Sequence, residues 1–367
     1  MAKTDPAHEA TDRLIEEMNR KLATEYRQAA EEVEEKLNDY WRRFQVKDEI
    51  WQLQVAKGEK TAEEYRMWRE SQLINGERWE ELRDTLAADL HRSNDAARRI
   101  VRGYQAEVYA ENHNYATYEV EHAANINTGA VLYNREAVER IMQDNPDVLP
   151  GVREGKGADV NLGAKIPKTK DERWQAGKIQ SVTVQSILQG ESIPNMARRI
   201  SRELGTANYK SAVRYARTAS TAAENAGRRD AYQHMEEIGV VMMQEWRATY
   251  DERTRHEHRL LDGQKVPVGE PFEVDGYEIM YPGDPNAEPF LVWNCRCSVR
   301  AAVSGLEPRA RQYRSNAAAG GMTYDEWLEA TPKSRDIEYQ TRVGEAIRGS
   351  YIAEYKAARE ALEGDED

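Results

Sequence analysis

The N-terminal part of the chain carries one long stripe of apolar residues. Between Glu9 and Phe44 there is no glycine or proline, and apolar side chains recur at spacings of three and four. The average repeat, about 3.6 residues, predicts a straight amphipathic α-helix rather than a supercoil. We expect the stripe to pack on the rest of the chain or on a partner; it consists of Ile15, Met18, Leu22, Tyr26, Ala29, Val33, Leu37, Tyr40 and Phe44.

The pattern then changes three times along the chain. Helical composition continues to residue 124, glycines and prolines are frequent up to residue 178, and helical periodicity returns at Ile179. After Gly239 the apolar residues form short runs separated by turn signals such as Asp275-Gly276, which is typical of strands and hairpins. The expected strands are Val240–Trp246, Phe272–Val274, Tyr277–Tyr281 and Phe290–Trp293.

This pattern predicts a mainly α protein with a small β-rich module, an α+β fold. We divide it into an N-terminal region of long helices (1–124), a loop-rich connector (125–178), a module of helices followed by short strands (179–303), and a helical C-terminal tail (304–367).

Composition narrows the class of protein. The chain has 367 residues, a formal net charge of −13 and a mean hydropathy of −0.87. No stretch approaches the roughly 18 consecutive apolar residues of a membrane helix, so we expect no membrane association. The first twelve residues lack the basic and apolar regions of a secretory signal, and two cysteines cannot build a disulfide framework. A reducing compartment is therefore expected.

One segment is basic although the whole chain is acidic. Residues 198–229 contain eight arginines and lysines against two glutamates. Such a concentration can face the phosphates of nucleic acid. The alternative is that acidic N-terminal helices neutralise these side chains. The residues expected to contact DNA are Arg198, Arg199, Arg202, Arg214 and Arg217.

The β-rich segment gathers residue types that bind metals: Asp251, His256, His258, Cys295 and Cys297. Zinc takes sulfur, imidazole nitrogen and carboxylate oxygen in tetrahedral sets, and a small module with little core gains stability from such an ion. The alternative is that the thiols are small buried apolar groups while the aspartate pairs with an arginine. The arginines available for that pairing are Arg253, Arg255 and Arg296.

Enzymatic interpretations are weaker. The histidines at 256 and 258 lack the spacing of a zinc peptidase, and the Cys-x-Cys motif lacks the spacing of a zinc deaminase. A metal-dependent nuclease, or another enzyme, with a metal on Asp251 and His258 as general base is the enzymatic alternative.

A series of motifs in this segment, taken in order, resembles the phage Mu protein F-like head morphogenesis family. The resemblance runs from about Ile179 to Val299, and Ala219 departs from it, since the family usually shows an acidic residue there. The motifs are GESI at 190–193, ARRI at 197–200, ART at 216–218, WRATYDERTR at 246–255, His258, LDGQ at 261–264, Phe272, Gly276, YPGDP at 281–285 and NCRC at 294–297.

The resemblance implies a minor capsid protein that is not an enzyme. Such a protein is internal to the virion after assembly in the host cytoplasm, and acts in head assembly and in DNA packaging or delivery. The implied partners are the portal protein, a major capsid or scaffold protein, and phage DNA bound non-specifically.

The resemblance also selects site residues. The family motif supplies one histidine, which matches His258 rather than His256. The set expected to hold a structural zinc is therefore Asp251, His258, Cys295 and Cys297, and the structural positions of the motif are Trp246, Arg253, Arg255 and Asn294.

Overall fold

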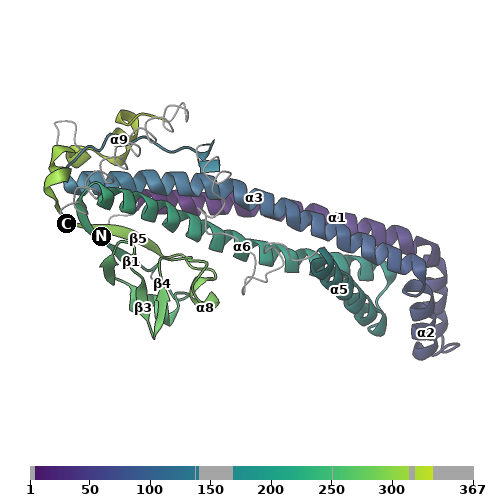
Figure 1. The fold of residues 1–367 in the computed structure, drawn as a ribbon. Coiled ribbons are helices and arrows are strands. Elements are labelled where there is room, and N and C mark those ends of the chain that lie inside the picture. The colour runs from purple at the N-terminus through teal and green to yellow at the C-terminus, as the bar shows by residue number, and fades with distance from the viewer. Residues whose placement is uncertain (1–4, 137, 140–167, 250, 314–318, 334–367) are drawn as a thin grey trace, which may run out of the picture.

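Three long helices form an elongated bundle in the computed structural model (Figure 1). They are α1 (Pro6–Ala56), α3 (Glu77–Ala124) and α6 (Ile193–Glu237). At a rise of 1.5 Å per residue, α1 is about 75 Å long. The structure describes residues 5–333 except 137, 140–167, 250 and 314–318.

The apolar stripe of α1 is buried by the chain itself. From Ile15 to Leu37 every stripe residue is buried, and Tyr40 and Phe44 pack against the same core. The predicted helix is thus confirmed. Its apolar stripe packs on the rest of the chain and is not left free for a partner. Beyond the stripe, at the C-terminal end of α1 and on α2, four apolar side chains remain exposed: Val46, Ile50, Leu53 and Met67.

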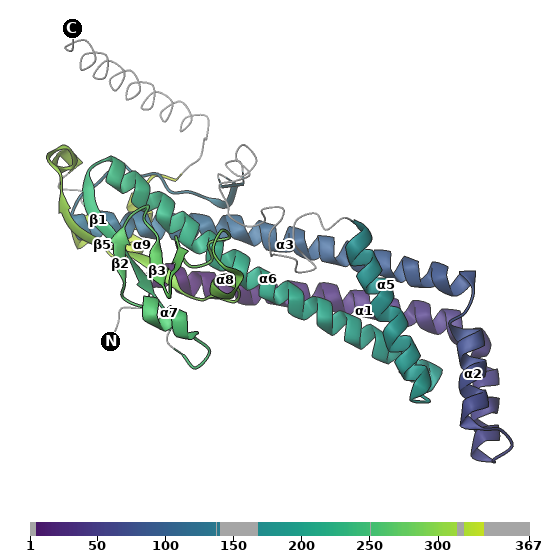
Figure 2. The ribbon, with the colours of Figure 1, turned by 60° about the horizontal axis from the view of Figure 1, so that its bottom comes forward.

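Two shorter helices close one end of the bundle, which we call the tip (Figure 2). They are α2 (Ala62–Leu73), which begins with a capping box between Thr61 and Glu64, and α5 (Lys168–Leu188). The core of the tip contains Trp41 stacked on Trp79 with ring centroids 5.7 Å apart. None of the described helices combines the length and the apolar character needed to cross a lipid bilayer.

At the opposite end α6 approaches α3 very closely. A Cβ on Gly227 would lie 2.5 Å from the carbonyl oxygen of Tyr109, so only glycine fits at this crossing. One residue later, Arg228 is fully buried and pairs with Asp5, the N-cap of α1, at 2.6 Å. The N-terminus of α1 is thereby fixed beside the part of α6 that faces the β-rich module.

The module is built from two small antiparallel sheets. The larger has the order β2-β1-β5, formed by Lys265–Pro267, Val240–Arg247 and Ser298–Leu306. The smaller is the hairpin of β3 (Phe272–Val274) and β4 (Tyr277–Ile279). Its turn residues Asp275 and Gly276 both have positive φ, which confirms the predicted turn.

One expected strand was wrong, and one long strand was not expected. Residues 290–293 do not form a strand, because Pro289 begins the short helix α8 (Pro289–Val292), whose first turn suits the fixed φ of proline. The longest strand, β5, escaped prediction because its alanines, serines and glycine give it little strand propensity. Pairing along the whole length of β1 compensates for this.

The module is joined to the bundle through a continuous core. Ala116, Val120 and Ala124 of α3 and Tyr232 and Met235 of α6 pack with the strands. The loop after β4 also docks on α6, where a Cβ on Gly283 would lie 2.7 Å from the backbone nitrogen of Ala222. This contact accounts for the glycine in the YPGDP motif. The protein is therefore mainly α with a small β module, as predicted.

The chain beyond β5 returns to the end of α3 through η1 (Pro308–Tyr313), η2 (Ala319–Gly321) and α9 (Tyr324–Ala330). Trp327 of α9 is buried there and donates to Glu121 at 2.7 Å. Most of the predicted connector and residues 334–367 of the predicted tail lie outside the described residues. The proposed domain boundaries stay a prediction, although α1, α3 and α6 share one core.

Candidate metal centre

Two segments of the module carry the cluster of candidate ligands. The loop after β1 leads into the short helix α7 (His256–Leu261), and His258 is one of its two buried residues. Cys295 and Cys297 lie between α8 and β5 and are both buried. Because residues i and i+2 of an extended chain point to the same side, the Cys-x-Cys spacing sends both thiols toward α7.

The three side chains converge on one point. Nδ1 of His258 lies 3.2 Å from Sγ of Cys297 and 3.5 Å from Sγ of Cys295. One ligand atom from each residue lies within 4.8 Å of the other two, and all three residues are buried. Thus the structure brings together three of the four expected metal ligands.

The other nitrogen of His258 has a fixed role. Nε2 lies 2.9 Å from the carbonyl oxygen of Leu291, which can only accept a hydrogen bond. We therefore assign the ring proton to Nε2, which leaves a lone pair on Nδ1 directed at the thiols. Trp246, fully buried, supports the ring edge-on with centroids 5.6 Å apart.

The two thiols differ in acidity. Burial raises the pKa of Cys295 well above its ordinary value. The pKa of Cys297 is lowered to about 5, mainly because the Cys295 thiol donates to it and also because His258 lies beside it.

Asp251 lies outside this cluster. Its two carboxylate oxygens accept from Arg296 at 2.6 and 2.7 Å, and the backbone N–H of Arg253 also donates to it. The Arg296 guanidinium holds the pKa of the Asp251 carboxyl well below its usual range. The side chain of Arg296, which lies between the two cysteines, points away from the thiols and binds Asp251. Asp251 therefore pairs with an arginine, which was the alternative to metal binding.

The remaining motif residues shape the loops around the cluster. Arg253 is exposed, whereas Arg255 is the N-cap residue of α7 and places a guanidinium nitrogen 3.4 Å from Nε2 of His258. Asn294 has a positive φ of 55°, a conformation that asparagine tolerates better than most residues, and its N–H donates to Thr218 of α6. These contacts favour structural roles. His256, the alternative imidazole, is exposed.

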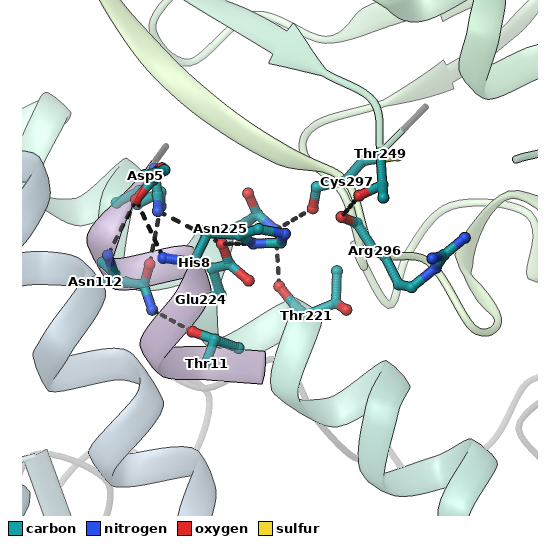
Figure 3. Close-up of polar contacts among 12 residues, drawn as sticks. Asp5, His8, Thr11, Asn112, Thr221, Glu224, Asn225, Thr249, Arg296 and Cys297 are labelled. Carbon is teal, nitrogen blue, oxygen red and sulfur yellow. Dashed lines mark hydrogen bonds and ion pairs between the residues drawn. The ribbon is translucent and has the colours of Figure 1, made fainter. Parts of the chain in front are cut away.

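Polar residues of α6 hold the Cys-x-Cys segment in place (Figure 3). Thr221 donates to the carbonyl oxygen of Cys295 at 2.6 Å, and Asn225 donates to that of Cys297 at 3.2 Å. Asn225 also accepts from the N–H of Val299 at 2.9 Å. Neither residue was expected from the sequence. Their signal was a polar pair four residues apart on the alanine-rich face of a helix, a position that favours burial.

The expected DNA-contacting arginines spread along α6 rather than forming one cluster. Arg199 is paired with Glu191 and Glu203, both at 2.9 Å, and Arg198 lies 4.0 Å from Glu34. Among the described residues, the other three make no ion pair. Arg202 is exposed, Arg214 lies over the ring of Trp293, and Arg217 is half-buried with a lowered pKa because of desolvation.

The geometry does not favour the nuclease interpretation. His258 is 2% exposed, with one nitrogen bound to a carbonyl and the other facing two sulfurs. A general base needs a lone pair within reach of the substrate. Asp251 is likewise occupied by Arg296.

Comparisons with known proteins confirm the family resemblance of the sequence motifs. Residues 177–300 match the family described as Phage Mu protein F like protein. No solved structure matches the chain.

Two curated proteins are similar over most of the chain. Minor head protein GP7 of Bacillus phage SPP1 is 25% identical over 60% of this chain and 68% of its own length. NAD(+)--arginine ADP-ribosyltransferase EFV of Enterococcus faecalis (strain ATCC 700802 / V583) is 27% identical over 66% of this chain and 47% of its own length. The chain thus spans about half of the second protein.

Proposed function

We propose that this chain is a minor head protein of a tailed phage, a structural component of the virion that acts in head morphogenesis. The observation that carries the proposal is the match of residues 177–300 to the Mu F-like family, in which the motif residues Trp246, Phe272, Cys295 and Cys297 pack in one core with the end of α6. The similarity to the SPP1 minor head protein over 68% of that protein supports it.

The same proposal includes a location inside the capsid and association with the portal protein during packaging or delivery of DNA. Because the stripe of α1 is buried, we take as the docking surface the tip patch, which we define as Val46, Ile50, Leu53 and Met67. An exposed apolar group of this kind on a charged helix suits a protein partner.

Assembly experiments test this proposal. The chain should be present in procapsids and virions and should co-purify with the portal protein. Ile50→Glu with Leu53→Glu should abolish portal binding, while Val241→Glu, a matched change of an exposed apolar residue in the β module, should leave it intact. Absence from virions would refute the proposed function, whereas virions that contain the double variant in normal amount would refute only the docking surface.

We propose further that the chain is not an enzyme. More than half of the Enterococcus transferase lies outside its match with this chain. Incubation with labelled NAD⁺ and an arginine analogue should therefore give no transfer, and incubation with DNA and divalent metal should give no cleavage. Metal-dependent cleavage of DNA that is lost in the His258→Ala variant would instead establish the nuclease alternative.

Non-specific contact with phage DNA completes the proposal. The chain as a whole is acidic, but Arg202, Arg214 and Arg217 lie on α6 without a carboxylate partner among the described residues. Arg202 and Arg214 are exposed and Arg217 is half-buried, and guanidinium groups spaced along a helix suit the backbone of DNA and do not read bases.

A further inference from the structure

We propose that His258, Cys295 and Cys297 form a zinc site with three protein ligands, the fourth position being filled by a non-protein ligand such as water. The ligand atoms are Nδ1 of His258 and the two cysteine sulfurs. Asp251 is not a ligand. This inference is independent of the head-protein function, because it rests only on the geometry of the module.

The distances suit a tetrahedral ion. With Zn–N near 2.0–2.1 Å and Zn–S near 2.3 Å, a tetrahedral angle places nitrogen and sulfur ligands about 3.5 Å apart. The separations of Nδ1 from the two sulfurs are 3.2 and 3.5 Å. A small outward movement of one thiol would therefore admit the ion between the three atoms.

The hydrogen bonds around the cluster are those that a metal ligand requires. A zinc-bound histidine usually donates its other N–H to a carbonyl or carboxylate, which fixes the ring. The contact between Nε2 of His258 and the carbonyl oxygen of Leu291, at 2.9 Å, performs this role. On the sulfur side, the backbone N–H of Cys297 donates to Sγ of Cys295 at 3.3 Å.

Charge balance also suits a buried site. Two thiolates and one neutral imidazole cancel the two positive charges of the ion, so the occupied site has no net charge. A neutral assembly avoids the desolvation penalty of an isolated buried ion. Binding replaces the protons of the thiols with the metal, and those protons pass to the buffer.

The site would connect three elements. His258 belongs to α7, the cysteines precede β5, and Thr221 and Asn225 of α6 hold the backbone of the cysteines. Zinc would therefore fix α7 against the larger sheet and the bundle. In the metal-free alternative, a thiol proton simply bridges Cys297 and His258, and the cluster is part of the apolar core.

Metal binding by the full chain tests the inference. Protein purified under reducing conditions should contain one zinc per chain. After chelation, Co²⁺ should restore the visible absorption of a tetrahedral site together with a thiolate charge-transfer band. Cys297→Ser and His258→Gln should each weaken zinc binding by at least about 100-fold. Asp251→Asn is the matched control and should bind zinc as the unchanged chain does.

Thiol reactivity in the unchanged chain covers the case in which the variants fail to fold. Zinc should slow alkylation of Cys295 and Cys297 at least tenfold, and chelation should reverse the protection. A folded chain that binds neither zinc nor Co²⁺, with alkylation unaffected by zinc, would overturn the inference. Loss of zinc binding in a folded Asp251→Asn variant would overturn the three-ligand set.

Discussion

Arg296 holds both carboxylate oxygens of Asp251, at 2.6 and 2.7 Å, and so connects the loop after β1 to the Cys-x-Cys segment. The arginine follows Cys295 and precedes Cys297, and its side chain lies on the face of the chain opposite to the thiols. Within residues 295–297, the two thiols therefore face the buried cluster with His258, and the side chain of Arg296 anchors the loop after β1.

The first prediction concerns this ion pair. Asp251→Asn should make residues 251–255 exchange amide hydrogen faster and become more sensitive to proteases, because the bidentate contact is lost. Arg253→Gln is the control, since Arg253 is exposed and its guanidinium lies 3.6 Å from the same carboxylate. Equal exchange in the two variants would contradict the assigned role of Arg296.

The Asp251–Arg296 pair should also make the stability of the loop after β1 depend on pH in the acid range. The pKa of Asp251 is lower in the folded chain than in the unfolded chain. Its contribution to stability is therefore complete above pH 4 or so and is lost as the pH falls through the lower, folded-state value. Acid titration followed by hydrogen exchange in the loop should show this loss, and Asp251→Asn should abolish it.

The second prediction is a loss of stability at alkaline pH. The carboxylate of Glu224 lies 2.7 Å from Nδ1 of His8 and raises the pKa of His8 from 6.5 to about 9. Because the folded-state pKa is the higher one, the stabilisation is complete below pH 6.5 and is lost as the pH rises through 9. The loss should amount to about 1–3 kcal/mol. Arg228 and Asp12 also face this pair.

Chemical denaturation at pH 6 and pH 9.5 measures this effect. His8→Gln should be less stable than the unchanged chain at pH 6, and the difference should shrink toward zero at pH 9.5. A difference that does not change with pH would show that the His8–Glu224 contact contributes through packing rather than through charge.

The third prediction compares two glycines in helices. Gly227→Ala should destabilise the protein by about 1–3 kcal/mol, because the added methyl would overlap the backbone of α3 at Tyr109. Gly177→Ala in α5 meets no atom within 4 Å and should stabilise the protein by about 0.4–1 kcal/mol. Thermal unfolding distinguishes these opposite signs, and a neutral Gly227→Ala would refute the close crossing of α3 and α6.

The fourth prediction concerns DNA. Binding should weaken steeply with salt, because the arginines release counterions from the phosphates. Replacing Arg202, Arg214 and Arg217 with glutamine should lower the slope of log K against log salt by up to about 2.7. Arg199→Gln is the control and should change the slope little, because Arg199 is paired with Glu191 and Glu203. A folded chain without affinity for DNA at low salt would contradict the proposal.

Local patterns made much of the fold predictable. The repeat of about 3.6 residues in α1 and the Asp275-Gly276 turn report interactions between close neighbours in the chain, and the structure confirms both. The short helix at 289–292 and the strand β5 were missed because their conformations depend on other segments. For β5 the decisive contact is its pairing with β1, more than fifty residues earlier.

The residue types of the site could be identified from the sequence alone. Histidine 258 and the Cys-x-Cys motif were identifiable as a potential metal-binding set, and the arginines around Asp251 as its potential partners. Which pairing each residue makes depends on distances between side chains far apart in the chain. Those distances follow only from the packing of α7, the segment before β5, and α6. Tertiary structure therefore decided that Arg296 takes Asp251, and that His258 faces the two thiols.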